Sequence, residues 1–438
     1  MKNYIYIETY GCSANKNNSE IIKGILKQSG YQLTTNLEIA EILIFNTCIV
    51  KGKTESKIKR KIQDTIKNYP NKLIIISGCM PETDLESLQN LYPKAIFLGL
   101  FHIKEITKLI KDEIENKLTK QKQKFYLSKI KEEKIFLPKI PENKLISITQ
   151  ISEGCLGDCT FCKTKFAKKS LYSYQQDKIL KSIESDLKKG AKEVWITSQD
   201  NASYMLDKKE ISQLPILLKK ILDLKHNFKL RLGMMNPENV YSILDELIEI
   251  YKNKNFYKFL HIPIQSASNN ILKNMNRKYK IEKVIEIINK FKKNILNITI
   301  STDIISGYPT EKLIDHSENI QFIKNFKPDV FNLSKFSSHK NTLAGNLKIL
   351  DKKIINNRAT ELMNLHRITA KQNKQKFINK QINVFVNKKT NIPYVYESRD
   401  INYNIVLITS KNKDILGKNI KVMIKDIGVH HMIGELIL

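Results

Sequence analysis

The sequence predicts an α/β protein of three domains. Short apolar runs alternate with longer amphipathic stretches over most of the chain, which is the order expected of parallel strands with helical crossovers. The last segment changes to runs of period two, typical of short antiparallel strands. We expect an open parallel α/β sheet in residues 1–118, a charged linker in 119–141, a partial (β/α) barrel in 142–374 and a small antiparallel β-barrel in 375–438.

The first domain is expected to alternate strands and helices. The strands are predicted at 4–10, 41–45, 72–77 and 95–98, and the helices at 19–28, 53–67, 84–91 and 103–114. Ile21, Ile22, Ile25 and Leu26 have helical spacing, and Gly30 stands where a C-cap glycine is common. This order favours a parallel sheet.

The linker is rich in lysine at 120–124 and 129–134, and Pro138 and Pro141 help to end it. After it, strands are predicted at 145–151, 193–197, 229–233, 259–263, 297–304 and 329–333, with helices at 177–188, 214–222, 240–250, 280–291 and 314–323. At least six βα units suggest a full or partial barrel. The terminal strands include 381–386, 405–409, 419–424 and 432–438, enough for a small barrel.

Composition favours a globular protein with an anionic partner. The chain has 438 residues, 41% of them hydrophobic, and 74 basic against 44 acidic residues give a net charge of +30. Such a charge favours nucleic acid, although lysines spread along the whole chain also fit a compositional bias. No apolar run is long enough for a membrane span, and no signal-peptide core precedes Glu8. We therefore expect a cytoplasmic protein with no membrane partner.

Three of the six cysteines follow predicted strands of the first domain. Cys12, Cys48 and Cys79 each come within three residues of a strand end. The carboxyl ends of parallel strands lie along one edge, where open α/β sheets build ligand sites. Three thiolates there would suit an iron–sulfur cluster with one open iron. Three independent buried cysteines are the alternative.

The other three cysteines form a tight motif. Cys155, Cys159 and Cys162 have the spacing C-x3-C-x2-C directly after the first predicted barrel strand. A short loop of this kind can bind three irons of a cubane cluster and leave the fourth open. Structural zinc would need a fourth Cys or His nearby, and none occurs before Trp195.

This motif resembles the radical S-adenosylmethionine superfamily, and nearly the whole chain resembles its methylthiotransferase branch. The segments that carry the resemblance are Thr-Tyr-Gly-Cys-Ser-Ala-Asn at 9–15, Asn-Thr-Cys at 46–48, Gly-Cys-Met-Pro at 78–81, Leu-His-Ile-Pro-Ile-Gln-Ser at 260–266, Met-Asn-Arg-Lys-Tyr at 275–279 and Thr-Asp-Ile-Ile-Ser-Gly-Tyr-Pro at 302–309. The terminal barrel is similar to a TRAM domain, an RNA-binding module. Residues 154–165 and 195–200 look most like the archaeal and eukaryotic type that acts on N6-threonylcarbamoyladenosine.

The resemblance implies methylthiolation at C2 of that adenine, at position 37 of tRNA. No ordinary base removes a proton from this carbon, so the reaction requires a radical supplied by a cofactor. The resemblance also implies two 4Fe-4S clusters, one at Cys155, Cys159 and Cys162 and the other at Cys12, Cys48 and Cys79, with S-adenosylmethionine as cofactor. The partners that it implies are the tRNA anticodon stem-loop and a reductant protein. Enzymes for isopentenyladenosine tRNA or a ribosomal-protein aspartate are the nearest alternatives, and a non-catalytic iron–sulfur nucleic-acid-binding protein is a third.

Cofactor contacts are expected at barrel strand ends. Ser198, Gln199 and Asp200 are candidates for the amino group of S-adenosylmethionine, and residues 303–309, with Asp303, Gly307 and Pro309, for its adenine and ribose. Gln265 and Ser266 are expected in the same pocket. All these residues also suit ordinary polar strand ends. His261 is expected to be a hydrogen-bonded core residue.

The terminal domain offers candidate RNA contacts, and a few positions depart from the family pattern. Lys388, Lys389, Arg399, Lys411 and Lys413 are candidates for phosphate contacts, and Tyr394, Tyr396 and Tyr403 for base stacking.

The departures are Lys168 and Lys169 where Arg-Gly is usual, Ala267 and Thr310 where Gly is usual, and His339, Lys340 and Asn341 in place of an Arg-Pro-Gly run. None of them is a candidate cluster ligand.

Overall fold

The structure is a computed structural model that describes residues 4–50, 52–114, 125–127, 131 and 133–437. The chain divides into two compact units. The first comprises Met1–Glu142, Ile148–Leu156 and Cys162–Ser182, and the second comprises Asn143–Ser147, Gly157–Phe161 and Ile183–Leu438. Among the described helices, none combines the length and apolar character that a bilayer crossing requires.

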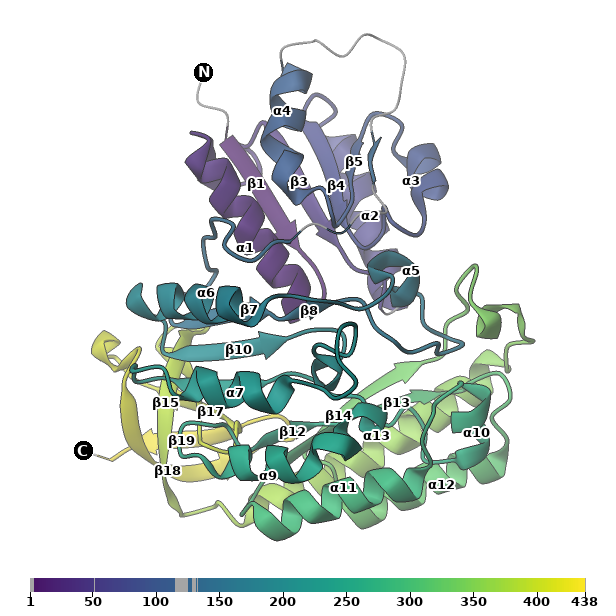
Figure 1. Cartoon of the computed structure of the whole chain (residues 1–438), viewed down its shortest axis with the longest axis vertical. Helices are drawn as coiled ribbons and strands as arrows, with labels where there is room; N and C mark the ends of the chain where they lie inside the picture. The colour runs from purple at the N-terminus through teal and green to yellow at the C-terminus, as the bar shows by residue number, and fades with distance from the viewer. Residues whose placement is uncertain (1–3, 51, 115–124, 128–130, 132, 438) are drawn as a thin grey trace. The chain divides into compact units, whose positions relative to one another are not determined.

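The first unit is built on a parallel sheet (Figure 1). Its strands, in the order β2-β1-β3-β4-β5-β6, are β1 (Tyr4–Thr9), β2 (Gln32–Thr34), β3 (Ile42–Thr47), β4 (Leu73–Gly78), β5 (Ile96–Leu98) and β6 (Phe125–Tyr126). Every residue of β3 is buried. A strand covered on both faces needs no polar alternation, which explains the run Ile-Leu-Ile-Phe. The predicted parallel sheet is confirmed.

Helices cover both faces of this sheet. α1 (Ser13–Gln28) and α4 (Ile106–Ile114) pack through Ile22, Leu26 and Leu109 on one face, and α2 (Gly52–Asn68) and α3 (Leu85–Leu91) pack through Ile58, Ile62 and Leu88 on the other. The predicted start of the first helix at residue 19 was wrong, because α1 begins at Ser13. Its first turns bury Asn15, Asn17 and Asn18, so they lack the apolar pattern that marks a helix.

Part of the expected linker packs on the first unit. Its basic run 120–124 lies outside the described residues, whereas β6 pairs with β5 and Lys134 is buried. The backbone N–H of Ile140 donates to the carbonyl oxygen of Glu20 at 2.9 Å. A Cβ at Gly24 would come within 2.1 Å of the Pro138 carbonyl oxygen. Gly24 therefore permits the close approach of this segment to α1.

The partial barrel consists of two three-stranded sheets, β11-β10-β7 and β12-β13-β14, in which β10 and β11, β12 and β13, and β13 and β14 pair in parallel. The strands are β7 (Ile146–Gln150), β10 (Glu193–Thr197), β11 (Lys229–Leu232), β12 (Phe259–His261), β13 (Thr299–Ser306) and β14 (Val330–Lys335). The crossover helices include α6 (Gln176–Lys188), α7 (Leu214–Leu222), α9 (Leu244–Lys252), α11 (Ile281–Asn294) and α12 (Leu313–Phe326). The boundary between the two units runs through β7 and α6. The expected partial barrel is confirmed.

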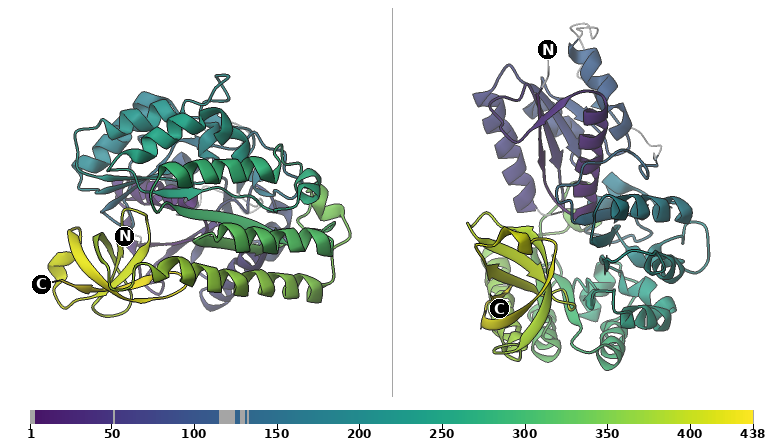
Figure 2. Two further views of the ribbon diagram at one scale, coloured as in Figure 1. Left: turned by 90° about the horizontal axis from the view of Figure 1, so that it is seen from below. Right: turned by 90° about the vertical axis from the view of Figure 1, so that its left-hand side faces the viewer.

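A long helix that the sequence reading did not place, α13 (Lys352–Gln375), leads to the terminal barrel. This closed barrel has the order β15-β16-β17-β19-β18 (Figure 2). Its strands are β15 (Gln381–Lys389), β16 (Val395–Arg399), β17 (Ile405–Thr409), β18 (Asn419–Ile427) and β19 (Met432–Leu436). β17 and β19 pair in parallel, so the barrel is not wholly antiparallel as predicted. Val384, Val406 and Ile424 are among its core residues.

Candidate active site

The three N-terminal cysteines follow three neighbouring strands. Cys12 comes after β1, Cys48 after β3 and Cys79 after β4, and these strands are adjacent in the sheet. Cys48 and Cys79 are buried, whereas Cys12 is exposed at the start of α1. The topology therefore places all three at the carboxyl edge of the sheet.

Two asparagines join the cysteine loops. The side-chain amide of Asn15 donates to the carbonyl oxygens of Thr47 at 2.8 Å and Tyr10 at 3.0 Å. The amide of Asn46 donates to the carbonyl oxygen of Asn15 at 2.8 Å, and the N–H of Cys79 to that of Thr47 at 3.1 Å. Both asparagines lie in motifs that the sequence singled out, but the sequence did not reveal this bridging.

Glycine precedes two of these cysteines because the backbone demands it. Gly11 has φ +100° and Gly78 has φ +91°, values that disfavour a Cβ. A Cβ at Gly11 would lie 2.7 Å from Cys48 Sγ, and one at Gly78 would lie 2.4 Å from the Thr47 carbonyl oxygen. The space beside the Cys48 sulfur is therefore kept open.

Burial governs the ionisation of Cys48 and Cys79. It raises the pKa of Cys79 to about 12, although the charge of Lys168 acts in the opposite direction. Burial also raises the pKa of Cys48. Cluster ligands are thiolates, so iron binding must displace these protons.

The arrangement of the N-terminal cysteines suits an iron–sulfur cluster. They lie at one edge of the sheet, and the space beside the Cys48 sulfur is open. An iron–sulfur cubane is wider than one ion, and three thiols on separate strand ends can surround it with one iron left open. The N-terminal cysteines thus fit the group that the resemblance implies.

The second set of cysteines lies in the loop after β8 (Ser152–Glu153), and all three are partly exposed. Cys155 and Cys162 belong to the first unit and Cys159 to the second. The N–H of Cys155 donates to the carbonyl oxygen of Lys169 at 3.3 Å. Arg277 Nη1 donates to Cys159 Sγ at 3.1 Å, a contact to a candidate cluster sulfur that sequence reasoning missed. Hydrogen bonds of this kind influence the potential of a cluster.

Lys168 belongs to a buried charge cluster. Glu153 accepts from Lys134 at 2.5 Å, from Lys168 at 3.3 Å and from the hydroxyl of Tyr174 at 2.7 Å. Burial alone would raise the pKa of Glu153, but the two lysines and the hydrogen bonds lower it to about 2. Lys168, where arginine is usual, therefore still carries a paired buried charge.

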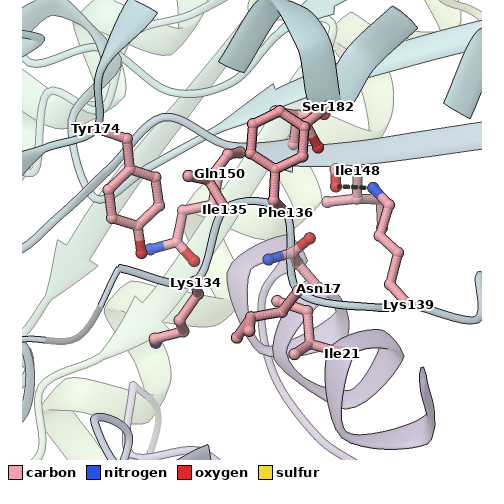
Figure 3. Close-up of a pocket in the computed structure, with 12 residues that line it drawn as sticks. Asn17, Ile21, Lys134, Ile135, Phe136, Lys139, Ile148, Gln150, Tyr174 and Ser182 are labelled. Carbon is pink, nitrogen blue, oxygen red and sulfur yellow. Dashed lines mark hydrogen bonds between the residues drawn. The ribbon is translucent and has the colours of Figure 1, made fainter. Parts of the chain in front are cut away.

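Figure 3 shows a cavity of the first unit beside this cluster. Its lining includes Asn17 and Ile21 of α1, Lys134, Gln150 and Tyr174. Lys139 Nζ donates to the carbonyl oxygen of Ile148 at 3.2 Å along one wall. The cavity is lined by the segment that follows β6 and by residues of α1 and β7, a combination that the sequence did not predict.

The expected cofactor residues at the end of β10 have different environments. Asp200 is buried and accepts from the backbone N–H groups of Asn236 at 2.9 Å and Ala202 at 3.0 Å and from the amide of Asn239 at 2.7 Å. Burial raises its pKa to about 6, against the effect of these hydrogen bonds. Ser198 Oγ is buried without a hydrogen-bond partner among the described residues. Gln199 lies between Ser198 and Asp200 in the sequence.

The remaining cofactor candidates lie on β13 and in the segments after β12 and β13. Asp303 Oδ2 lies 2.5 Å from His261 Nε2. His261 is thus hydrogen-bonded, as expected, but its partner is a candidate site residue. The hydroxyl of Ser266, itself buried, accepts from the N–H of Ser268 at 3.2 Å.

Backbone geometry marks two further candidates. Gln265 has φ +66° and exchanges backbone hydrogen bonds with β13, donating to Asp303 at 2.8 Å and accepting from Ile305 at 2.9 Å. The N–H of Gly307 lies 3.2 Å from each carboxylate oxygen of Glu311. Pro309 follows two residues later. The structure brings these residues to the carboxyl ends of neighbouring strands.

The expected stacking residues of the terminal barrel are mostly buried. Tyr396 is 2% exposed and Tyr403 8%, and Tyr403 packs against Tyr257 and Phe259 of the partial barrel. The expectation that these two tyrosines stack on RNA was therefore wrong, because they are core residues. Tyr394 is 52% exposed.

Arg399 is also engaged inside the protein, because it donates to Glu397 at 2.7 Å and to the carbonyl oxygen of Tyr403 at 3.1 Å. The four candidate lysines, in contrast, are exposed: Lys388, Lys389, Lys411 and Lys413. The candidate phosphate contacts of this barrel thus reduce to lysines.

Two family models match the chain. One is described as uncharacterized protein family UPF0004 and matches residues 4–99, and the other is the radical SAM superfamily at residues 149–323. The first match contains Cys12, Cys48 and Cys79, and the second contains Cys155, Cys159 and Cys162.

Solved structures share the fold. A cobalamin-dependent S-adenosylmethionine radical enzyme, OxsB, has a TM-score of 0.54 at 12% identity, covering 83% of this chain and 56% of that one. The radical S-adenosylmethionine methyltransferase TsrM from Kitasatospora setae has a TM-score of 0.56 at 11% identity, covering 79% and 74%. At these identities the likeness concerns the fold alone.

Curated relatives match along almost the whole chain. A probable threonylcarbamoyladenosine tRNA methylthiotransferase of Archaeoglobus fulgidus is 34% identical over 99% of this chain and 98% of its own length. That of Methanocaldococcus jannaschii is 33% identical over 99% and 97%, and the Homo sapiens enzyme is 31% identical over 98% and 73%. The chain belongs to the threonylcarbamoyladenosine tRNA methylthiotransferase family of the radical SAM superfamily.

Proposed function

We propose that this chain transfers a methylthio group to C2 of N6-threonylcarbamoyladenosine at position 37 of tRNA, with S-adenosylmethionine as cofactor. The observation that carries the proposal is the presence of two separate cysteine trios, one at the carboxyl edge of the first sheet and one in the loop after β8. The relatives that carry this name match nearly the full length of the chain.

The loop cysteines Cys155, Cys159 and Cys162 would hold the cluster that binds S-adenosylmethionine, and Cys12, Cys48 and Cys79 would hold a second 4Fe-4S cluster. When bound, this cofactor and its cluster supply the radical chemistry that breaks a C–H bond which no side-chain base can open. The protein residues position these groups. Arg277 donates a hydrogen bond to Cys159, and Gly11 keeps space beside Cys48.

Strand ends of the partial barrel would bind S-adenosylmethionine. Ser198 offers an unpartnered hydroxyl among the described residues, and Gln199 lies beside it. Asp200 would act by shaping the loop, because its carboxylate is used by Asn236, Asn239 and Ala202. The segments with Gln265, Ser266, Asp303, Gly307 and Pro309 would contact the adenine and ribose.

The anticodon stem-loop of tRNA is the proposed substrate, and a reductant protein would supply electrons in the cytoplasm. The exposed lysines of the terminal barrel and Tyr394 are the side chains there that remain available for phosphate contact and stacking. The net charge of +30 would strengthen binding at low salt.

Mass spectrometry of tRNA nucleosides from a deletion strain tests the substrate. Loss of 2-methylthio-N6-threonylcarbamoyladenosine is the expected result. An unchanged nucleoside profile would instead favour the ribosomal-protein aspartate, and loss of methylthio-isopentenyladenosine would favour that tRNA substrate.

Anaerobic reconstitution tests the enzyme class. The chain should bind about eight irons and convert S-adenosylmethionine to 5′-deoxyadenosine when reduced. About four irons would overturn the second cluster. A fully loaded chain that forms no 5′-deoxyadenosine would point to a non-catalytic iron–sulfur protein.

A further inference from the structure

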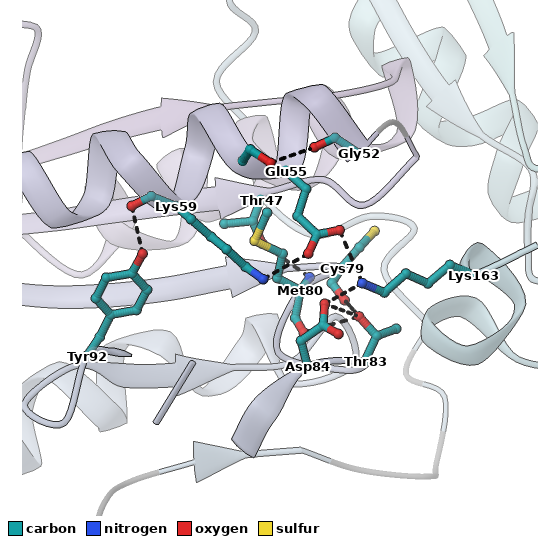
Figure 4. A network of polar contacts seen from close by, with 11 residues as sticks. Thr47, Gly52, Glu55, Lys59, Cys79, Met80, Thr83, Asp84, Tyr92 and Lys163 are labelled. Atoms are coloured by element: carbon teal, nitrogen blue, oxygen red, sulfur yellow. Dashed lines mark hydrogen bonds and ion pairs between the residues drawn. The ribbon is translucent and has the colours of Figure 1, made fainter. Parts of the chain in front are cut away.

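Lys163 connects the loop that carries Cys162 to the N-terminal sheet within the first unit. It directly follows Cys162, yet its side chain is only 6% exposed. Its ammonium group lies 3.1 Å from Glu55 Oε2 and 2.5 Å from Asp84 Oδ2 (Figure 4). A lysine next to a cluster ligand is thus bound to two carboxylates from distant parts of the sequence.

The two carboxylates belong to the segments that carry the other cysteines. Glu55 lies in the first turn of α2, which follows Cys48, and Asp84 lies directly before α3, which follows Cys79. Thr83 Oγ1 donates to Asp84 at 3.2 Å and lies 3.4 Å from the carbonyl oxygen of Cys79. The ion pairs of Lys163 therefore end close to both buried cysteines.

Burial distinguishes this link from an ordinary surface ion pair. The side chains of Glu55 and Asp84 are each only 14% exposed, so solvent screens their charges weakly. Removal of Lys163 would leave two acidic groups close together without their shared cation, which is unfavourable in a poorly solvated site. Water entry or movement of the loop would relieve this repulsion.

A reaction that uses two clusters depends on how they face each other, because errors of about 1 Å can cost about a hundredfold in rate. We propose that Lys163 is a positioning residue that fixes Cys162 relative to the loops of Cys48 and Cys79, and thereby couples cofactor cleavage to sulfur insertion. This inference rests on the proposed function, because it takes both cysteine trios as cluster ligands.

The chain provides a matched control. Lys59 Nζ lies 2.9 Å from Glu55 Oε1, and both residues belong to α2. Lys59→Met therefore removes a cation from the same carboxylate without separating α2 from the cysteine loop. Lys163→Met puts an uncharged side chain of similar length in place of lysine and thereby removes the ion pairs between the two segments, whereas Lys163→Arg keeps the charge.

Two measurements on the full chain test the inference. In the iron-free protein, amide hydrogen exchange in α5 (Thr164–Lys168) should become about tenfold faster in Lys163→Met and stay near the wild-type rate in Lys59→Met. In the reconstituted enzyme, methylthiolated tRNA formed per 5′-deoxyadenosine should fall about tenfold or more in Lys163→Met only. Lys163→Arg should restore most of this ratio.

Equal coupling in Lys163→Met and wild type would overturn the inference and leave the proposed function intact. The same loss of coupling in Lys59→Met would also overturn it. A wild-type chain that makes no 5′-deoxyadenosine would overturn the proposed function itself. If Lys163→Met does not fold, Glu55→Gln, which retains the Asp84 pair, must still lower coupling more than Lys59→Met does.

Discussion

The two cysteine trios reach their places by different means. Cys12, Cys48 and Cys79 are far apart in sequence and meet because β1, β3 and β4 are neighbours in one parallel sheet. Cys155, Cys159 and Cys162 lie within one short loop and are partly exposed. The first trio depends on tertiary structure and the second chiefly on local chain geometry. Changes in the sheet should therefore damage the N-terminal site more than the loop site.

The largest effect is expected from Cys159→Ala, which should abolish 5′-deoxyadenosine formation. Cys48→Ala should leave that cleavage within a few fold of wild type but stop formation of the methylthio product, because it removes a ligand of the other site. Each variant should lose about half of the bound iron. Liquid chromatography of both products, with iron analysis, measures the division. Equal cleavage in both variants would mean that the two trios do not divide the chemistry.

Gly11→Ala should affect the N-terminal site by a steric route. The new Cβ would lie 2.7 Å from Cys48 Sγ at a backbone φ of +100°, so it should displace that thiol and reduce iron at this site by more than half. Gly30→Ala is the control, because its φ is +91° but a Cβ there has no heavy atom within 4 Å. Both variants carry backbone strain costing about 1 kcal/mol or more, but only Gly11→Ala should lose iron. Similar iron loss in both would assign the effect to strain.

The burial of Cys48 and Cys79 predicts that iron binding at the N-terminal site depends on pH. A variant with alanine at the three loop cysteines should take up more iron as pH rises from 7 to 9, by up to about tenfold in affinity per pH unit for each proton released. Because the pKa of Cys79 is raised to about 12, this thiol stays mostly protonated between pH 7 and 9 in the iron-free protein, and iron must displace its proton. A flat profile for the N-terminal trio would contradict ionisation of buried thiols.

The raised pKa of Cys79 has the opposite effect on the stability of the iron-free fold, which should fall as pH rises. The pKa of Cys79 is higher in the folded chain than in the unfolded chain, so the neutral thiol stabilises the folded state below about pH 8.5. This contribution is lost as the pH rises toward 12. Urea unfolding of the iron-free protein at several pH values should therefore show falling stability above about pH 8.5.

Sequence periodicity was sufficient for the layers of the fold and for the positions of the cysteines. Parallel strands place their carboxyl ends together whatever their side chains, so the convergence of Cys12, Cys48 and Cys79 at one sheet edge could be predicted from strand order alone. The start of α1 could not, because its buried asparagines have no apolar pattern and are held by contacts with other loops.

Contacts between side chains distant in sequence were also beyond prediction. Arg277 donates to Cys159, and Lys163 pairs with Glu55 and Asp84, but nothing in the local sequence marks these partners. Tyr403 looked like an RNA-stacking residue because the sequence does not distinguish a tyrosine exposed on the terminal barrel from one that packs on the partial barrel. Deletion of the terminal barrel would therefore expose Tyr257 and Phe259, and a loss of tRNA binding in such a truncated chain would not isolate an RNA contact.

The smallest effect is expected from the backbone of Lys169, next to the loop trio. Lys169 has φ 59° and ψ −153°, a region that side chains other than glycine rarely occupy, at a cost of about 1–3 kcal/mol. Its carbonyl oxygen accepts from the N–H of Cys155 at 3.3 Å, so the strain lies beside a candidate cluster ligand. The Lys169 ammonium is 3.9 Å from Glu82, and its side chain is 32% exposed, so this pair contributes little.

Lys169→Gly should therefore raise the stability of the iron-free chain by about 1 kcal/mol, since relief of strain exceeds the added entropy of an unfolded glycine. Lys169→Ala removes the same ion pair but keeps the strain, so it should be slightly less stable than wild type. Urea denaturation of both variants measures the difference. If the glycine variant proved no more stable than the alanine variant, the backbone beside Cys155 would not be strained, and local chain geometry alone would account for the loop trio.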